Sequence, residues 1–267
     1  MAKEIALIGC GNMGGAMVKG IVASGLVKPE DITVSSFSRK SQEKVSAELG
    51  CVGTCDNVEA VKGAHMVIVA VKPQYLDKVV REFAGELEHD AILVSIAAGV
   101  SLERLERLVG AGHKIVRVMP NLAAGVGEAM SALSPNANVS KDEVAHVKEL
   151  FDSFGKSEIV PEELMDAVVA VSGSSPAYVC MFIEAMADAA VIEGMPRRQA
   201  YAFAEQALLG TAKFLLESGT HPAVLKDMVC SPAGTTITGV AELEAGRFRS
   251  TIIGAMLACA ERNRELS

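Results

Sequence analysis

The sequence predicts an α/β protein, with a doubly wound parallel sheet in the first part of the chain and helices alone in the second. Strand and helix signals alternate through about the first 155 of the 267 residues, and no convincing strand follows Pro161. A glycine-rich turn joins the first expected strand to the first expected helix. We therefore expect two domains, at residues 1–160 and 161–267.

The glycine-rich turn is Gly9–Gly14, which reads G-x-G-x-x-G and follows the apolar run Ile5–Ile8. Apolar residues then recur at helical spacing up to Gly25, a typical helix end. Gly11 would let a phosphate approach the backbone, and Gly14 would let the helix pack close to the strand. The helix N-terminus would add N–H groups and partial positive charge. This context predicts a dinucleotide site, against the alternative of a turn that binds nothing, and its candidate residues are Gly9, Gly11, Asn12, Met13 and Gly14.

Four further apolar runs are typical of buried parallel strands and lie at Ile32–Val34, Met66–Val71, Ile92–Ile96 and Ile115–Val118. Helix signals separate them, at Gln42–Leu49, Gln74–Phe83 and Leu102–Leu108. The right-handed crossover rule favours helices on both faces of such a sheet. Ligands of these sheets bind beyond the carboxyl ends of the strands, so the residues there are candidate site residues.

The run Ile32–Val34 is followed by Ser35–Lys40, which lacks the acid that commonly holds the ribose 2′-hydroxyl of NAD. The hydroxyls of Ser35 and Ser36, with the guanidinium of Arg39, would instead suit a 2′-phosphate. The expected cofactor is therefore NADP, with NADPH preferred and NADH as the alternative. The other interpretation is a solvated loop with an ordinary Arg–Lys pair.

Two other strand ends carry candidate cofactor residues. Lys72 is either a phosphate or ribose contact or an ordinary surface lysine, and Pro73 suits the first position of a helix. Ala97 and Ala98 follow the run Ile92–Ile96, and such small residues would let a flat ring approach the backbone.

The second half of the chain predicts helices at Leu164–Val171, Pro176–Ile192, Arg197–Leu216 and Pro222–Met228, with helix again from Ile237 to the end. The longer helices are rich in alanine and apolar on most sides, so they must be buried. Without a sheet to cover them, we expect a homodimer formed from about residue 165 onward. A larger ring built from such dimers is a further option.

Two clusters of polar residues, Ser172–Pro176 and Cys230–Thr236, each precede an expected helix N-terminus. Their N–H groups and hydroxyls suit a small carboxylate, and a simple helix cap is the alternative for each. No Ser-His-Asp or Cys-His arrangement stands out, which fits a hydride transfer in which the cofactor carries the chemistry.

Composition excludes several classes. A net charge of −8 argues against a nucleic-acid partner, and the absence of an uninterrupted apolar run of about 18 residues argues against a membrane span. The six cysteines form no C-x-x-C pair and the five histidines are scattered, so no metal site is expected. Strand signals begin at Ile5, which leaves no room for a signal peptide. We therefore expect a cytoplasmic protein whose cysteines are free thiols.

An ordered set of motifs resembles the pyrroline-5-carboxylate reductases along essentially the whole chain. The motifs are Gly9–Gly14, Ala70–Gln74, Ser95–Val100, Arg117–Asn121, Ser172–Tyr178, Leu225–Asp227, Ser231–Thr236, Leu243–Glu244 and Gly246–Arg249. The sequence departs from the family pattern at Ala233 and Ser175, where glycine is common in the family.

The resemblance implies a Rossmann domain followed by a helical dimerisation domain, and reduction of 1-pyrroline-5-carboxylate to L-proline with NAD(P)H. It implies a substrate site that uses both protomers, with Thr236 as the catalytic residue at the ring nitrogen. The substrate-binding residues that it implies are Glu162, Ser231, Gly234, Thr235 and Thr236. The cofactor residues that it implies are Ser35, Asn57, Val71, Lys72, Pro73 and Ala97.

Two other functions stay open at this point. A β-hydroxyacid dehydrogenase would need a lysine that faces the nicotinamide, and Lys213 and Lys226 are the available ones. A non-catalytic NADP-sensing protein would keep Gly9–Gly14 but would not need Ser231–Thr236.

Overall fold

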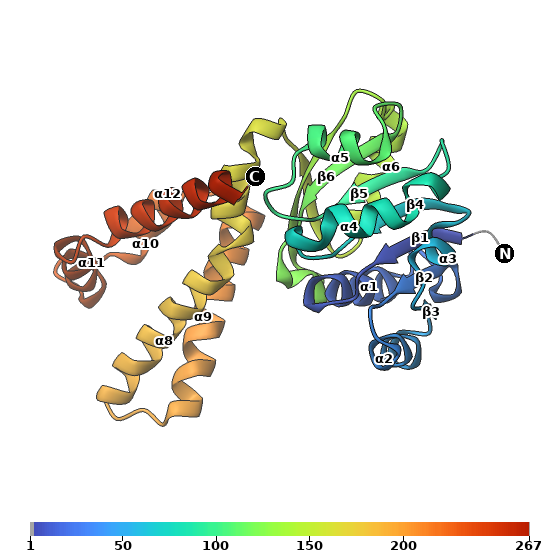
Figure 1. The fold of residues 1–267 in the computed structure, drawn as a ribbon. Coiled ribbons are helices and arrows are strands. Elements are labelled where there is room, and N and C mark those ends of the chain that lie inside the picture. Colours follow the sequence, from blue (N-terminus) through green and yellow to red (C-terminus); the bar gives the residue numbers. More distant parts are fainter. Residues whose placement is uncertain (1–2, 267) are drawn as a thin grey trace. The chain divides into compact units, whose positions relative to one another are not determined.

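A computed structural model describes residues 3–266, in which eight strands form one sheet (Figure 1). The strands are β1 (Lys3–Ile8), β2 (Ile32–Ser35), β3 (Val52–Thr54), β4 (Ala64–Val69), β5 (Ile92–Ser95), β6 (Lys114–Met119), β7 (Ala129–Pro135) and β8 (Gly155–Ile159). Their order across the sheet is β3-β2-β1-β4-β5-β6-β7-β8. The first six strands are parallel, β7 is antiparallel to β6, and β8 is parallel to β7.

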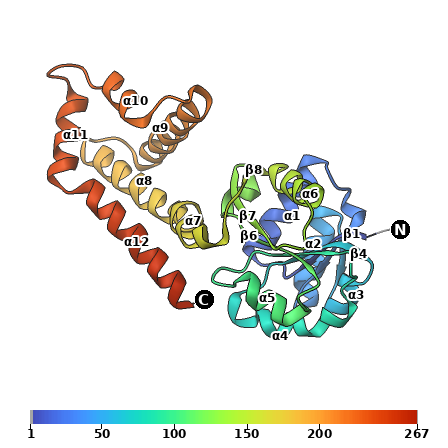
Figure 2. The ribbon, with the colours of Figure 1, turned by 90° about the horizontal axis from the view of Figure 1, so that it is seen from above.

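Helices cover both faces of this sheet, as the view in Figure 2 shows. One face packs against α1 (Asn12–Ser24), α2 (Arg39–Leu49) and α6 (Lys141–Asp152). The other packs against α3 (Asn57–Val61), α4 (Pro73–Phe83) and α5 (Leu102–Val109). Successive strand residues point to opposite faces, so a run such as Ile5–Ile8 contributes to both cores and is apolar throughout.

The expected strands and helices of this part are present, but the predicted set was incomplete. The structure adds three strands, β3, β7 and β8, and two helices, α3 and α6. In β7 the buried residues Ser131 and Ser134 interrupt the apolar signal, and in the edge strand β8 only Ser157 is buried. These strands therefore lack the continuous apolar pattern on which the prediction relied.

The chain divides into two compact units. The sheet unit consists of the residues up to Ser174 together with those from Cys259 onward, and the helical unit spans Ser175–Ala258. The predicted domain boundary, at residue 160, lies just after the last strand rather than at Ser174, and it stays a prediction. The helices of the second part are α8 (Ser175–Ile192), α9 (Arg197–Ser218), α10 (Pro222–Val229), α11 (Thr235–Ala245) and α12 (Phe248–Leu266).

Two expectations about the helices were wrong. The cluster Ser172–Pro176 opens no free helix N-terminus, because α7 (Met165–Val168) continues through a π-helical turn at Val169–Gly173 into α8. The N–H of Ser174 donates to the carbonyl of Val169 at 2.8 Å, so it is already used. The helix expected to run from Ile237 to the end breaks after α11, since Arg247 adopts a φ of 58°.

Candidate functional site

Glycine geometry shapes the turn between β1 and α1. Gly9 has a φ of 97°, and its N–H donates to the carbonyl of Ser35 at 3.0 Å. A side chain at Gly14 would collide with the carbonyl oxygen of Gly9. A Cβ at Gly11 would meet nothing within 4 Å, so the backbone there faces open space. The turn therefore packs closely against the sheet on one side and leaves room for a ligand on the other.

The N-terminus of α1 fits an anion. Gly11 is its N-cap, no side chain caps it, and its first turn carries no acidic residue. The N–H groups of Asn12 and Met13 therefore have no side-chain acceptor among the described residues. Burial raises the pKa of the neighbouring Cys10 thiol, which keeps it uncharged beside this anion-binding end.

The end of β2 carries a linked set of polar side chains. The hydroxyl of Ser35 donates to Oδ1 of Asn57 at 2.6 Å, and Nδ2 of Asn57 donates to Glu82 at 2.7 Å. The hydroxyl of Ser36 is buried and has no hydrogen-bond partner among the described residues. Such an orphaned polar atom calls for an explanation, and a ligand at this edge would supply one.

Arg39 lies in the first turn of α2 rather than in a loop, directly after the N-cap residue Ser38. Its side chain is exposed and forms no ion pair with another described residue. Beside it, the ring of Phe37 is fully exposed. Phe37, an aromatic residue just after a strand end that lacks the usual acid, was not among the residues predicted from the sequence.

The remaining predicted cofactor residues lie at the ends of β4 and β5. Lys72 and Pro73 open α4, and Val71 approaches the glycine turn at Gly9. Ala97 is buried, and its N–H donates to the hydroxyl of Ser95 at 3.4 Å. The predicted cofactor residues thus lie at the carboxyl ends of β1, β2, β4 and β5, except Asn57, which follows β3 at the start of α3 and contacts Ser35.

The loop Cys230–Gly234 joins α10 to α11. The N–H of Gly234 donates to the carbonyl of Ser231 at 3.0 Å, and Ala233 has a φ of 58°. Gly234 is the N-cap of α11, no side chain caps this helix, and its first turn has no acidic residue. Thr236 therefore is not a cap, and the cap alternative for it was wrong. This end of α11 suits a carboxylate.

Glu162 belongs to the sheet unit, whereas Ser231–Thr236 lies in the helical unit. Oε1 of Glu162 accepts hydrogen bonds from the N–H of Leu102 at 2.7 Å and from Nη1 of Arg117 at 3.0 Å. The predicted substrate residues therefore fall in two separate units. Within the described residues, no three side chains of the metal-binding types cluster.

Two family models match the chain. Residues 4–99 match "NADP oxidoreductase coenzyme F420-dependent", and residues 162–266 match "Pyrroline-5-carboxylate reductase dimerisation". The chain is 48% identical to the pyrroline-5-carboxylate reductase of Escherichia coli (strain K12) over 100% of this chain and 99% of that protein. It is 43% identical to the reductase of Methanosarcina acetivorans over 99% and 98%.

Solved structures agree with the sequence relatives. The structure of a pyrroline-5-carboxylate reductase from Coxiella burnetii matches with a TM-score of 0.92 at 31% identity, and it covers 100% of this chain and 99% of that one. The Plasmodium falciparum pyrroline carboxylate reductase with NADP bound matches with a TM-score of 0.90 at 30% identity and the same coverage. The chain belongs to the pyrroline-5-carboxylate reductase family.

Proposed function

We propose that this chain reduces 1-pyrroline-5-carboxylate to L-proline with a hydride from NAD(P)H. The observation that carries the proposal is the 48% identity to the Escherichia coli reductase along the whole chain. In the reaction the carbon of the C=N bond gains the hydride, the π electrons become a lone pair on nitrogen, and a proton from solvent binds that nitrogen to give N–H. NADPH supplies the hydride, and the protein holds the two reactants at reacting distance.

The residues at the carboxyl ends of β1, β2, β4 and β5 are the proposed cofactor site. The uncapped N-terminus of α1 and the open space at Gly11 would receive the pyrophosphate. Small residues at Ala97 and Ala98 would admit the nicotinamide ring. The set that we assign to the cofactor is Gly9, Gly11, Asn12, Met13, Gly14, Ser35, Ser36, Arg39, Asn57, Val71, Lys72, Pro73, Ala97 and Ala98.

NADPH is the proposed preference over NADH. The hydroxyl of Ser35 already donates its one hydrogen to Asn57, so it has no hydrogen left to donate to a phosphate. Ser36 has an unused hydroxyl, and Arg39 has an exposed guanidinium without a described ion-pair partner, so these two are the better phosphate donors. We also assign Phe37 to this end of the cofactor, where its exposed ring would stack on the adenine.

The proposed substrate site includes Ser231, Gly234, Thr235, Thr236 and Glu162. The free N–H groups at the start of α11 would hold the carboxylate, and the Thr236 hydroxyl would orient the ring nitrogen. An alcohol is a poor proton donor at neutral pH, so we assign Thr236 an orienting and relaying role. The cluster Ser172–Pro176, which spans the end of the π-helical turn and the start of α8, carries no part of this proposal.

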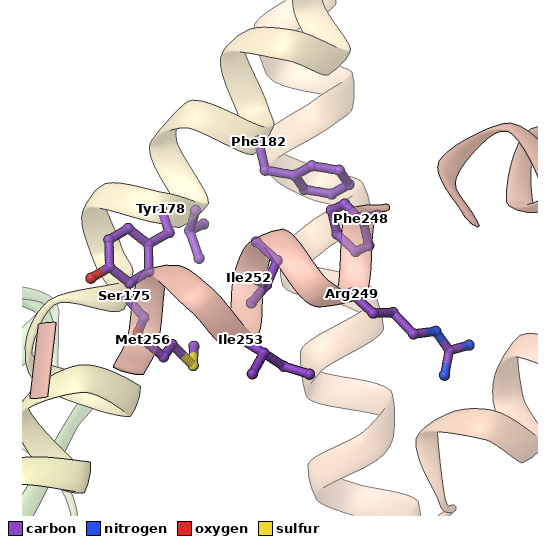
Figure 3. Close-up of a pocket in the computed structure, with 9 residues that line it drawn as sticks. Ser175, Tyr178, Phe182, Phe248, Arg249, Ile252, Ile253 and Met256 are labelled. Atoms are coloured by element: carbon purple, nitrogen blue, oxygen red, sulfur yellow. The ribbon is translucent and has the colours of Figure 1, made fainter. Parts of the chain in front are cut away.

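We also propose that two copies of the helical unit form a homodimer. Aromatic and aliphatic side chains of α8 and α12 line an open groove, in which the rings of Phe182 and Phe248 lie 5.9 Å apart (Figure 3). The helical run Glu162–Ile192 is long and apolar enough to cross a membrane by length and composition, and 6% of its most apolar stretch is buried within the chain.

A second copy is the occupant that we favour for this groove, because residues 162–266 match a dimerisation model. The same run carries Glu184 and Asp188, which suit a partly hydrated protein interface better than a lipid environment. A ring of dimers extends this proposal. All six cysteines are free thiols, which supports a cytoplasmic location.

The test is an absorbance assay of NADPH oxidation with pyrroline-5-carboxylate, alongside 3-hydroxy acids with NADP⁺. We expect turnover only with the imine. Oxidation of a 3-hydroxy acid would favour the dehydrogenase alternative, and cofactor binding without turnover would favour a sensor. Of the two lysines of the dehydrogenase alternative, Lys213 is largely exposed on α9, where it pairs with Glu217 at 3.7 Å. A hydrogen bond from Lys226 to Asp227 raises the pKa of Lys226, which keeps it charged.

A further inference from the structure

Arg117 is a buried cation in the middle of the sheet. Its residue is 8% exposed, and on β6 it lies in register with Ser95 of β5 and Ser134 of β7. Burial of a guanidinium is costly unless a carboxylate pairs with it. Among the described residues its carboxylate partner is Glu162, with Nη1 3.0 Å from Oε1.

The same carboxylate oxygen serves a second group. It accepts the N–H of Leu102 at 2.7 Å, and Leu102 is the first residue of α5. That N–H is one of the donors that a helix leaves without an internal partner. The N-cap residue Ser101 uses its hydroxyl for the N–H of Arg104 instead, at 3.2 Å. We call these contacts the Arg117–Glu162–Leu102 bridge.

The bridge closes one end of the loop between β5 and α5. At the other end, the hydroxyl of Ser95 accepts the N–H of Ala97. Between them Gly99 turns the chain with a φ of 70°, and Val100 is fully buried. The stretch Ala97–Ser101 is therefore held at both ends, by one hydroxyl and by one carboxylate.

We propose that Arg117 is a positioning residue for hydride transfer, which acts through Glu162 on the loop Ala97–Ser101. The proposal rests on the proposed function, because it takes Ala97 and Ala98 to face the nicotinamide. Arg117 fixes the carboxylate of Glu162, and that carboxylate fixes the start of α5 and so the end of the loop. A displacement of about 1 Å at the reacting atoms lowers rates by about 100-fold, so Arg117 acts on kcat through the position of the loop, in addition to the place of Glu162 in the proposed substrate site.

Arg117→Met and Arg117→Lys test the proposal, with Arg104→Met as the matched control. Arg104 lies on α5, as Leu102 does, but its guanidinium pairs with Asp77 of α4 at 2.8 Å instead of with Glu162. The measurements are Tm, the Kd of NADPH by fluorescence, and kcat and KM for pyrroline-5-carboxylate, all well below Tm. We expect Arg117→Met to lower kcat by about 10- to 100-fold and to raise the Kd of NADPH.

We expect Arg117→Lys to recover part of the lost kcat, and Arg104→Met to lower Tm alone. Normal kcat and Kd in a folded Arg117→Met variant with a lowered Tm would overturn the proposal in favour of a structural ion pair. A rise in the KM of the imine with unchanged kcat and unchanged Kd of NADPH would also overturn it, because Glu162 would then act only through its place in the proposed substrate site and not on the loop.

Leu102→Pro provides a second route if the Arg117 variants fail to fold. Proline is tolerated at the first helical position, and it removes the N–H that Glu162 accepts. Ser101 already has the extended backbone that precedes proline, with φ −80° and ψ 159°. This variant should also lose kcat, and a normal kcat would contradict the proposal. If the wild-type chain did not reduce the imine, the proposed function would fail. The Kd of NADPH, compared between the wild type and the Arg117 variants, would still test whether the bridge positions the loop.

Discussion

The two units of this chain bury their apolar residues differently. In the sheet unit large side chains such as Leu7, Phe83 and Phe151 are fully buried in two cores. In the helical unit the buried residues of α9 are Ala200 and Ala204, and α10 and α11 have none. The sheet unit therefore completes its own core, whereas the helical unit exposes apolar surface that an isolated copy would leave in water.

The largest expected effect comes from a charge in the α8–α12 groove. Phe182→Glu would place an unpaired carboxylate in the proposed dimer interface, and such burial costs several kcal/mol. We expect dissociation to monomers and a loss of activity of about 100-fold or more, measured by sedimentation and by NADPH oxidation. Leu26→Glu is the control on the sheet unit, where Leu26 is already 43% exposed. A fully active Phe182→Glu monomer would contradict the assembly.

The next effect separates catalysis from stability within the helical unit. Thr236→Val removes a hydroxyl that caps nothing, so Tm should stay near wild type. One hydrogen bond to a charged group is worth about 1.5–3 kcal/mol, which predicts a loss of kcat/KM of about 10- to 150-fold. Thr236→Ser should retain much of the activity. Wild-type turnover by the valine variant would remove Thr236 from the mechanism.

A smaller pair of effects tests the cofactor end of the sheet unit. Arg39→Asp should weaken NADPH by about 10-fold or more relative to NADH, because only NADPH carries the 2′-phosphate. Phe37→Ala should weaken both cofactors equally, by about 3- to 10-fold, because both carry adenine. Kd values from fluorescence titrations give both ratios. Equal losses of the two cofactors in Arg39→Asp would show that Arg39 does not read the phosphate.

The smallest effect concerns pH and the sheet unit alone. Hydrogen bonds from Lys114 and Ser140 lower the pKa of Glu143 from 4.5 to about 2. A carboxyl whose folded pKa is lowered stabilises the fold above its unfolded pKa, and this contribution is lost as the pH falls from 4.5 towards 2. Glu143 also completes the capping box of α6, so Glu143→Gln should cost about 1 kcal/mol at pH 7.

Urea titrations at pH 7 and pH 3 check this prediction. The wild type should lose more free energy of unfolding between the two pH values than Glu143→Gln does. An identical pH dependence in both proteins would show that Glu143 does not contribute to it.

The sequence predicted best what local pattern determines. The run Ile5–Ile8 and the strand expected at Met66–Val71, which the structure has as Ala64–Val69, are apolar because both faces of the sheet are covered, and both were found. The edge strand β8 was missed, because Lys156 and Glu158 point to solvent and leave no apolar run. The strand ends were readable as a site because parallel strands place their carboxyl ends at one edge.

Contacts between distant residues were outside the reach of the sequence. Arg117 and Glu162 are 45 residues apart, and no local sequence pattern around either residue predicts that they pair. The error at Ser172–Pro176 has a related cause, since serine and glycine are typical of helix ends and also occur in a π-helical turn. Which of these forms depends on the packing of the surrounding helices rather than on the local sequence.

The backbone of Ala233 has a consequence for ligand binding. A residue with a side chain costs about 1–2 kcal/mol in the left-handed region that Ala233 occupies, whereas glycine enters it freely. In the disordered loop, glycine at position 233 would have access to more backbone conformations than alanine has. At a positive φ this strain exceeds the entropy that alanine removes from the disordered loop, so alanine lowers the stability of the ordered loop and leaves it less prepared for its ligand than glycine would.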